Sequence, residues 1–162
     1  QSENVAALAS AAREGGAAAV TMIGRMLGML PDLETMAPAL DTNLGYGGPW
    51  ALPLTCYWLA RSRRSLGNDY PLIGTNGARS GHDVARMLLA GASAVEMCSA
   101  VMTGGFGVLG AAVDQLAAYL GDHDVAANAI VGRAADRVKG FADLPARGEI
   151  WREFVPPATL AG

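Results

Sequence analysis

The sequence predicts an α/β fold in which short parallel strands alternate with helices. Segments with helical spacing of apolar residues alternate strictly with short apolar segments over residues 1–120. The short segments are apolar on both faces, as the strands of a buried parallel sheet are. A glycine-containing loop follows each of them. Such alternation indicates a parallel sheet, either closed into a barrel or doubly wound.

The size and composition of the chain restrict its class. Its 162 residues suffice for one core. The formal net charge of −3, without a basic block, argues against a nucleic-acid partner. No apolar run approaches the roughly 20 residues that span a bilayer, so we expect no membrane span. The two cysteines suggest a reducing compartment and a cytoplasmic location. Because Gln1 directly opens a helix, we expect further sequence upstream.

The first helix should have Ser2 as its N-cap and end at residues 15–16, a glycine pair. Its predicted buried face comprises Val5, Leu8, Ala9 and Ala12. A strand is predicted over 18–23. The next stretch, 24–48, contains several glycines and prolines, and we predict a long irregular loop. Loops of this length in compact domains are usually functional.

The second helix is predicted over 52–64 and the second strand over 70–74. Ser80 should cap the third helix, with Asp83 completing a capping box. The predicted buried face of that helix comprises Val84, Met87 and Leu88.

The third strand is predicted over 94–98, the third loop over 99–105 and the fourth helix over 106–120. The predicted apolar stripe of the fourth helix comprises Leu109, Val113, Leu116 and Leu120. A weaker helix over 126–138 and an extended tail complete the chain. Residues 14–22 and 89–97 resemble each other, as repeated units of a barrel do.

Two successive loops have the chemistry of a phosphate site. Ligands of parallel α/β folds bind at the carboxyl ends of the strands. Thr75, Asn76 and Gly77 follow the second strand, and Cys98 and Ser99 follow the third. Backbone amides can point at an anion there, and a serine hydroxyl can donate to it. The alternative is that the glycine serves only a tight turn.

An ordered set of segments resembles the end of the dihydroorotate dehydrogenase and dihydropyrimidine dehydrogenase family. The segments are Glu14–Ala17 with Val20–Thr21, Gly45–Pro49 with Pro53, Leu72–Ala78, Ser80–Asp83 and Leu89–Val101. The resemblance implies that residues 1–120 form the C-terminal half of an FMN-binding (β/α)8 TIM barrel. Residues 121–162 would then be a helical C-terminal extension and tail.

The resemblance also implies a cofactor site for FMN. The backbone at Thr75, Asn76, Gly77 and Cys98–Ser99 would hold the FMN phosphate. Gly47–Gly48 would pass close to the flavin or its ribityl chain. The family has glycine where this chain has Asn76.

Two departures from the family pattern bear on substrate and catalysis. Gly24 and Arg25 stand where we expect the family's Asn and Thr or Ser, which bond the pyrimidine ring. They become the candidate substrate-binding residues. Arg25 either is a solvated loop residue or selects an anionic group of the substrate. The resemblance implies that the family's strand-five lysine and the loop with its acid/base Cys or Ser lie upstream of Gln1, so the catalytic residues are left unassigned. Cys56 is expected to pack on a helix.

The two histidines, His82 and His123, are predicted to lie on the surface, and no metal site is predicted.

We therefore predict an FMN-dependent oxidoreductase acting on CH–CH groups, with hydride transfer at a C–C bond next to a carbonyl. Its expected partners are a small-molecule substrate, the N-terminal half of the barrel on the same or another chain, and further subunits of an oligomer. The alternatives are a phosphate-binding barrel without flavin and a non-catalytic structural half-barrel subunit.

Overall fold

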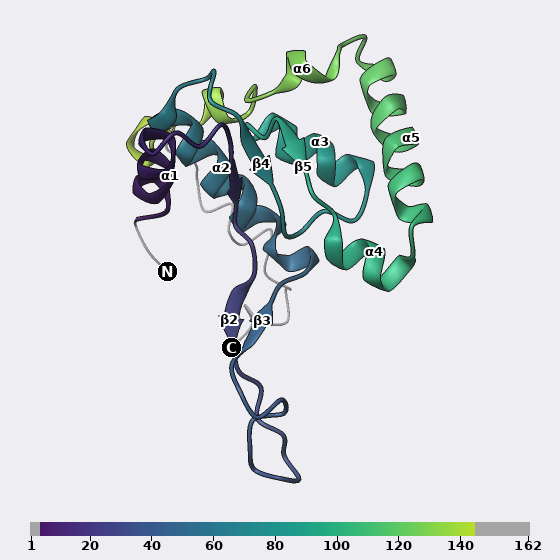
Figure 1. Ribbon diagram of the computed structural model, residues 1–162. Helices are drawn as coiled ribbons and strands as arrows, with labels where there is room; N and C mark the ends of the chain where they lie inside the picture. The colour runs from purple at the N-terminus through teal and green to yellow at the C-terminus, as the bar shows by residue number, and fades with distance from the viewer. Residues whose placement is uncertain (1–3, 145–162) are drawn as a thin grey trace, which may run out of the picture.

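The computed structural model describes residues 4–144 as a parallel sheet with surrounding helices and a projecting two-stranded ribbon (Figure 1). The elements in chain order are α1 (Val5–Glu14), β1 (Val20–Met22), β2 (Met26–Gly28), β3 (Leu44–Tyr46), η1 (Pro49–Ala51), α2 (Leu52–Leu66), β4 (Leu72–Gly74), α3 (Gly81–Leu89), β5 (Ala94–Val95), α4 (Cys98–Gly104), α5 (Gly107–Asp122), α6 (Ala127–Ile130), η2 (Ala135–Arg137) and η3 (Phe141–Asp143). The η elements are 3₁₀ turns. The predicted alternation of strands and helices is confirmed.

The sheet has the order β1-β4-β5, and both strand pairs are parallel. Met22 is paired with Gly74, and Gly74 with Val95, so the strands end side by side. The ladder continues past the strands, because the Thr75 amide donates to the Met22 carbonyl at 3.2 Å and the Glu96 amide donates to the Gly74 carbonyl at 2.8 Å. The loops that follow the three strands therefore leave from one edge, the carboxyl edge.

The two faces of the sheet have different surroundings. On one face Leu72 is fully buried in the same core as Leu59 of α2 and Met87 of α3. Gly74 permits this packing, since a β-carbon there would lie 2.9 Å from the Met87 sulfur. On the other face, Thr21 and Ala94 are exposed. This second face corresponds to the interior of a barrel, which three strands alone cannot close.

The capping box of α3 is confirmed with one change of partner. The Asp83 amide donates to the Ser80 hydroxyl oxygen at 3.3 Å, and the hydroxyl donates to the Asp83 carboxylate at 3.0 Å. The carboxylate also accepts from a backbone amide, as in a capping box, but this amide belongs to Arg79, at 3.0 Å, rather than to Ser80. The buried face of α3 includes Met87 and Leu88, as predicted.

The irregular loop predicted over 24–48 is instead built around an antiparallel ribbon. Strands β2 and β3 pair from Met26↔Tyr46 to Gly28↔Leu44, and Pro31 and Pro38 form a further bridge. The ribbon projects from the carboxyl edge of the sheet (Figure 1). The prediction was wrong because the pairing joins segments far apart in the chain, which leaves no local periodicity in either strand.

Residues 98–104 form helix α4, where the sequence predicts the end of a strand and a loop. Strand β5 ends at Val95, so Cys98 is the first residue of a helix. The weaker helix predicted over 126–138 is also wrong, since this segment divides into α6 and η2. Ser2 lies outside the described residues, and the N-cap position of α1 is Asn4, which makes no side-chain cap.

Three side chains predicted to be buried are exposed. Leu8, Leu109 and Val113 have exposed fractions of 67%, 41% and 65%. Helix α5 packs on α3 through the face that contains Ala112. Leu109 and Val113 are not buried by this packing, so this part of the predicted stripe is exposed in the described chain.

The segment after α5 packs on the outer helices. The Gly132 amide donates to the Leu88 carbonyl at 2.9 Å, and Arg63 of α2 pairs with Asp136 at 3.2 Å. Within residues 4–144 no single helix is long and apolar enough to cross a membrane; α4 and α5 together reach the required length and composition, but they are bent by 119° where they meet.

Candidate functional site

Most of the predicted site residues gather at the carboxyl edge of the sheet. Gly24 and Arg25 follow β1, Thr75–Gly77 follow β4, and Cys98–Ser99 follow β5. Because these strands are neighbours and end in register, the three loops start side by side. Gly47 and Gly48 come from the end of the ribbon and reach the same edge through Asn76.

The side chain of Asn76 joins three of the predicted segments. Its Nδ2 donates to the Gly24 carbonyl at 2.9 Å, and its Oδ1 accepts from the Gly48 amide at 2.9 Å. A β-carbon on Gly47 would lie 2.6 Å from this Oδ1, so glycine is needed there for the carboxamide to approach. Asn76 has φ 67°, a conformation that asparagine tolerates better than most residues. The sequence did not reveal this role, because it is carried by a side chain where only the backbone was considered.

Thr55 is a second residue that the sequence analysis missed. It is fully buried in α2, and its hydroxyl lies 2.7 Å from the Asn76 carbonyl and 3.2 Å from the Thr75 carbonyl, to which it donates. This contact fixes the β4 loop on α2. The available signal was a polar residue on the face of the helix that also carries Leu59 and Leu66.

Gly77 is explained by packing. Its φ is 127°, in the region that favours glycine, and a β-carbon would lie 2.6 Å from the backbone nitrogen and Cα of Leu52. The first turn of α2 therefore passes directly over Gly77. A glycine at this position does not by itself indicate a ligand.

Cys98 and Ser99 occupy the N-terminus of α4 and are exposed. The N-cap residue, Met97, makes no side-chain cap. First-turn amides of a helix have no partner within the helix and are suited to bind an anion. The Thr103 hydroxyl donates to the Ser99 carbonyl at 2.9 Å. Among the described residues, no hydrogen bond joins this pair to Asn76.

Arg25 lies on the exposed side of the ribbon. Its side chain crosses Gly45, where a β-carbon would collide with it. Within residues 4–144, the side-chain ion pairs join Arg63 to Asp136 and Arg86 to Asp83. In this part of the chain, Arg25 therefore has no carboxylate partner.

Two further polar side chains lie near the edge. Thr21 shares a row of the sheet with Ile73 and Ala94 on the face that corresponds to the barrel interior. Glu96 lies one residue past β5 and is exposed, whereas the preceding residue, Val95, is half-buried. Both stand out in the sequence as polar residues in otherwise apolar strand segments, which was the signal that could have found them.

The remaining candidates lie elsewhere. Cys56 is half-buried in α2, as predicted, and its burial raises the pKa of the thiol. His82 is exposed in the first turn of α3, and the Nδ1 of His123 lies 2.9 Å from the Tyr119 carbonyl. No group of three or more His, Cys, Asp or Glu side chains is placed to hold a metal in the part of the chain that the structure describes.

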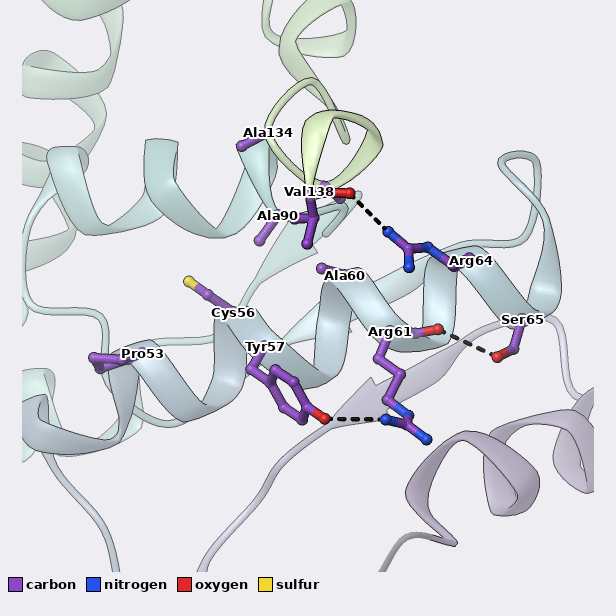
Figure 2. A pocket seen from close by; sticks show the side chains of 11 residues that line it. Pro53, Cys56, Tyr57, Ala60, Arg61, Arg64, Ser65, Ala90, Ala134 and Val138 are labelled. Carbon is purple, nitrogen blue, oxygen red and sulfur yellow. Dashed lines mark hydrogen bonds between the residues drawn. The ribbon is translucent and has the colours of Figure 1, made fainter. Parts of the chain in front are cut away.

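A cavity of about 550 Å³ lies along the outer side of α2, away from the carboxyl edge (Figure 2). Arg61 donates to the Tyr57 hydroxyl at 3.1 Å on its rim, and Arg64 donates to the Val138 carbonyl at 3.3 Å. None of the predicted site residues lines it. The cavity is therefore separate from the candidate site.

Comparisons with known proteins identify relatives of this chain. The family model described as dihydroorotate dehydrogenase matches residues 2–120. The chain is 38% identical over 98 residues to dihydroorotate dehydrogenase A (fumarate) of Limosilactobacillus reuteri, covering 60% of this chain and 31% of that protein. It is 34% identical over 107 residues to the catalytic subunit of dihydroorotate dehydrogenase B (NAD(+)) of Methanopyrus kandleri, covering 65% and 34%.

The chain thus spans about a third of the length of the curated relatives it matches. The fold resembles the ligand-free dihydroorotate dehydrogenase of Eimeria tenella, with a TM-score of 0.69 at 18% identity, over 86% of this chain and 38% of that one. This likeness identifies the sheet and its helices as part of a barrel. The chain belongs to the dihydroorotate dehydrogenase family, in which it fits the C-terminal half of the barrel.

Proposed function

We propose that the complete protein is an FMN-dependent oxidoreductase that acts at a C–C bond next to a carbonyl, and that this chain supplies the FMN phosphate site. The proposal depends on one observation: β4 and β5 end side by side, followed by the Thr75–Gly77 loop and by helix α4. Barrel phosphate sites are commonly built from the loops after the last two strands and the N-terminus of a short extra helix. Membership of the family supports the choice of flavin.

The groups present at this edge fit a phosphate. Cys98 and Ser99 are exposed, and the first-turn amides of α4 have no helical partner. The Ser99 hydroxyl adds a donor. The Gly48 amide, by contrast, already donates to Asn76. We therefore assign to Gly47 and Gly48 close passage beside the cofactor, without a hydrogen bond from the Gly48 amide.

When bound, the flavin supplies the hydride chemistry. The residues of this chain hold the cofactor and orient the substrate. Thr21 faces the barrel interior with a hydroxyl that can donate or accept a hydrogen bond. We assign no catalytic acid or base to this chain, because the titratable groups at its carboxyl edge include no histidine or buried carboxylate among the described residues.

For the substrate, we propose an anionic group recognised by Arg25. A guanidinium can bind a carboxylate through two parallel hydrogen bonds. Arg25 is exposed at the carboxyl edge without a carboxylate partner in the described chain, so its charge is available. We expect a preference for carboxylate- or phosphate-bearing substrates over neutral uracil or thymine.

The rest of the barrel must cover the sheet face that carries Thr21 and Ala94. Strand edges and apolar helix faces left open invite aggregation. Phe106, Leu109 and Val113 are also exposed in the described chain. We propose that an N-terminal half, on the same or another polypeptide, packs here.

The phosphate placement is tested with Ser99→Asp in the complete protein. An added carboxylate at the start of α4 repels phosphate, yet it suits the helix dipole, which favours it by about 0.3–1 kcal/mol. We therefore expect FMN content, measured by visible absorption after purification, to fall sharply while the apoprotein melts no earlier. Ser93→Asp is the control, since Ser93 is exposed at the opposite end of β5.

Full FMN content in Ser99→Asp contradicts the placement. A colourless parent protein that binds inorganic phosphate would instead favour a phosphate-binding barrel without flavin. A colourless parent that binds no phosphate would favour a structural half-barrel.

A further inference from the structure

We propose that Asn76 is a positioning residue, whose carboxamide fastens both ends of the β2–β3 ribbon to the β4 loop and so holds Arg25 at the carboxyl edge. The inference rests on the proposed function, because the role of Arg25 in substrate binding belongs to it.

The two hydrogen bonds of Asn76 reach the two ends of the ribbon. Gly24 lies just before β2 and Gly48 just after β3. Asn76 donates to the Gly24 carbonyl and accepts from the Gly48 amide, each at 2.9 Å. Only one orientation of the carboxamide satisfies both partners, because the flipped group would oppose oxygen to oxygen and N–H to N–H.

The clamp itself is anchored in the core. The buried Thr55 hydroxyl donates to the Asn76 carbonyl at 2.7 Å, which ties the residue to α2. Gly47 leaves room for the carboxamide, and any side chain at Gly47 would displace it. The backbone of Asn76 is therefore held by α2 and β4, independently of the ribbon.

Asn76 makes the hydrogen bonds between the ribbon ends and the sheet in the described residues. Besides the two bonds from Asn76, residues 24–48 are linked to the following residues, in the part that the structure describes, by the turn bond from the Ala51 amide to the Gly48 carbonyl at 2.9 Å. The side chains of Leu27, Leu33 and Met36 are exposed, at 71%, 89% and 90%, whereas Tyr46 stacks on Trp50 of η1 with ring centroids 5.1 Å apart. The polar attachment of both ribbon ends to the β4 loop therefore depends on Asn76.

Arg25 is placed by the same construction. It follows Gly24 directly, and its side chain lies across Gly45 of β3. The stem of the Arg25 side chain is thus positioned by the ribbon, and no ion pair holds its guanidinium in the part of the chain that the structure describes. If the Gly24 end is released, Arg25 is no longer held at a fixed position at the edge.

The experiment compares Asn76→Asp and Asn76→Gly with the parent in the complete, flavin-loaded protein. Dihydroorotate is the anionic probe, and dihydrouracil is the same ring without the carboxylate. Aspartate keeps the acceptor for Gly48 but opposes a carboxylate to the Gly24 carbonyl. We expect the KM for dihydroorotate to rise about tenfold, equivalent to about 1.4 kcal/mol, and to rise much more than kcat falls, because a lost binding contact affects KM first.

Three further readouts separate positioning from a general structural defect. In an Arg25→Met background, Asn76→Asp should add little, since the two changes act through one contact. As the pH is lowered, the KM ratio of Asn76→Asp to parent should return towards one, because a protonated carboxyl can donate to Gly24. Hydrogen exchange of the Gly48 amide, which needs no flavin, should be at least tenfold faster in Asn76→Gly. Asn128→Asp, on the exposed surface of α6, is the control.

An unchanged KM for dihydroorotate, additive effects of Asn76→Asp and Arg25→Met, or unaltered exchange at Gly48 would overturn the inference. Parallel losses of kcat, FMN and stability would also overturn it, since they would show a purely structural role. If the parent lacks flavin, the proposed function fails, whereas the exchange of Gly48 still decides whether the clamp exists.

Discussion

The polar groups of the loops after β1 and β4 are hydrogen-bonded within the chain, whereas the polar side chains that follow β5 are exposed. Asn76 and Thr55 satisfy the carbonyls and the Gly48 amide around the first two loops. Cys98 and Ser99, at the start of α4, have exposed side chains. The first part of the carboxyl edge is therefore pre-assembled, and the second part can receive a ligand. Binding sites work best when such rigid internal bonds support the groups that contact the ligand.

This difference changes how glycines at the edge are interpreted. Gly47 and Gly77 lie in loops that resemble ligand-binding loops, yet each has a neighbour within the chain: the Asn76 carboxamide and the backbone of Leu52. Glycine is needed both where the backbone approaches a ligand closely and where it approaches a helix closely. Only the tertiary contacts distinguish them.

The largest expected effect comes from breaking the pre-assembled part at Gly77. Gly77→Ala combines a left-handed backbone, which costs about 1–3 kcal/mol, with a collision against Leu52, which costs about 1–3 kcal/mol more. Gly67→Ala is the matched control, because Gly67 has φ 88° and nothing within 4 Å of its added β-carbon. Urea unfolding of the complete protein should show the greater loss of stability for Gly77→Ala. Equal losses would mean that the contact with Leu52 contributes nothing.

A smaller effect is expected from Thr55→Val. The substitution keeps the shape but removes the hydroxyl that donates to the Asn76 carbonyl, and leaving a partly buried carbonyl without this donor costs about 1–3 kcal/mol. Thr103→Val removes a comparable hydroxyl from α4, in the part of the edge that follows β5. Because Thr103 is exposed, this change should alter stability by less than about 0.5 kcal/mol. Denaturant midpoints compare the two variants. A loss in Thr103→Val as large as in Thr55→Val would erase the contrast between the two parts of the edge.

The smallest effect is expected outside the edge, at Asp136. The hydrogen bond from Arg63 lowers the pKa of this carboxyl below its usual value of 3.8. A carboxyl group whose pKa is lowered by folding stabilises the folded state at pH values above its usual pKa. This stabilisation is lost as the pH falls through the folded-state pKa. Asp136→Asn should therefore be less stable than the parent at pH 7, and the difference should vanish well below pH 3.8.

Thermal unfolding from neutral to acidic pH checks this prediction, with Asp114→Asn on the exposed surface of α5 as the control. FMN content at pH 7 should be unchanged in Asp136→Asn, since the pair lies outside the carboxyl edge. A parallel shift at every pH would show that the Arg63 contact is not the cause of the pH dependence.

The sequence by itself determined the alternation of helices with parallel strands, the cap at Ser80 and the gathering of residues 75–77 and 98–99 at one edge. These features follow from local patterns, because periodicity identifies an element and parallel strands place their carboxyl ends together. The family resemblance added that these elements form the end of a barrel.

The tertiary structure decided the ribbon, the clamp and the start of α4. The pairing of Met26 with Tyr46 and the bonds of Asn76 to Gly24 and Gly48 join residues many positions apart. No local propensity encodes such contacts, since they form only when several elements already lie in place. For the same reason Gly77 looked like a ligand contact in the sequence, and only the position of α2 shows that its missing side chain makes room for Leu52.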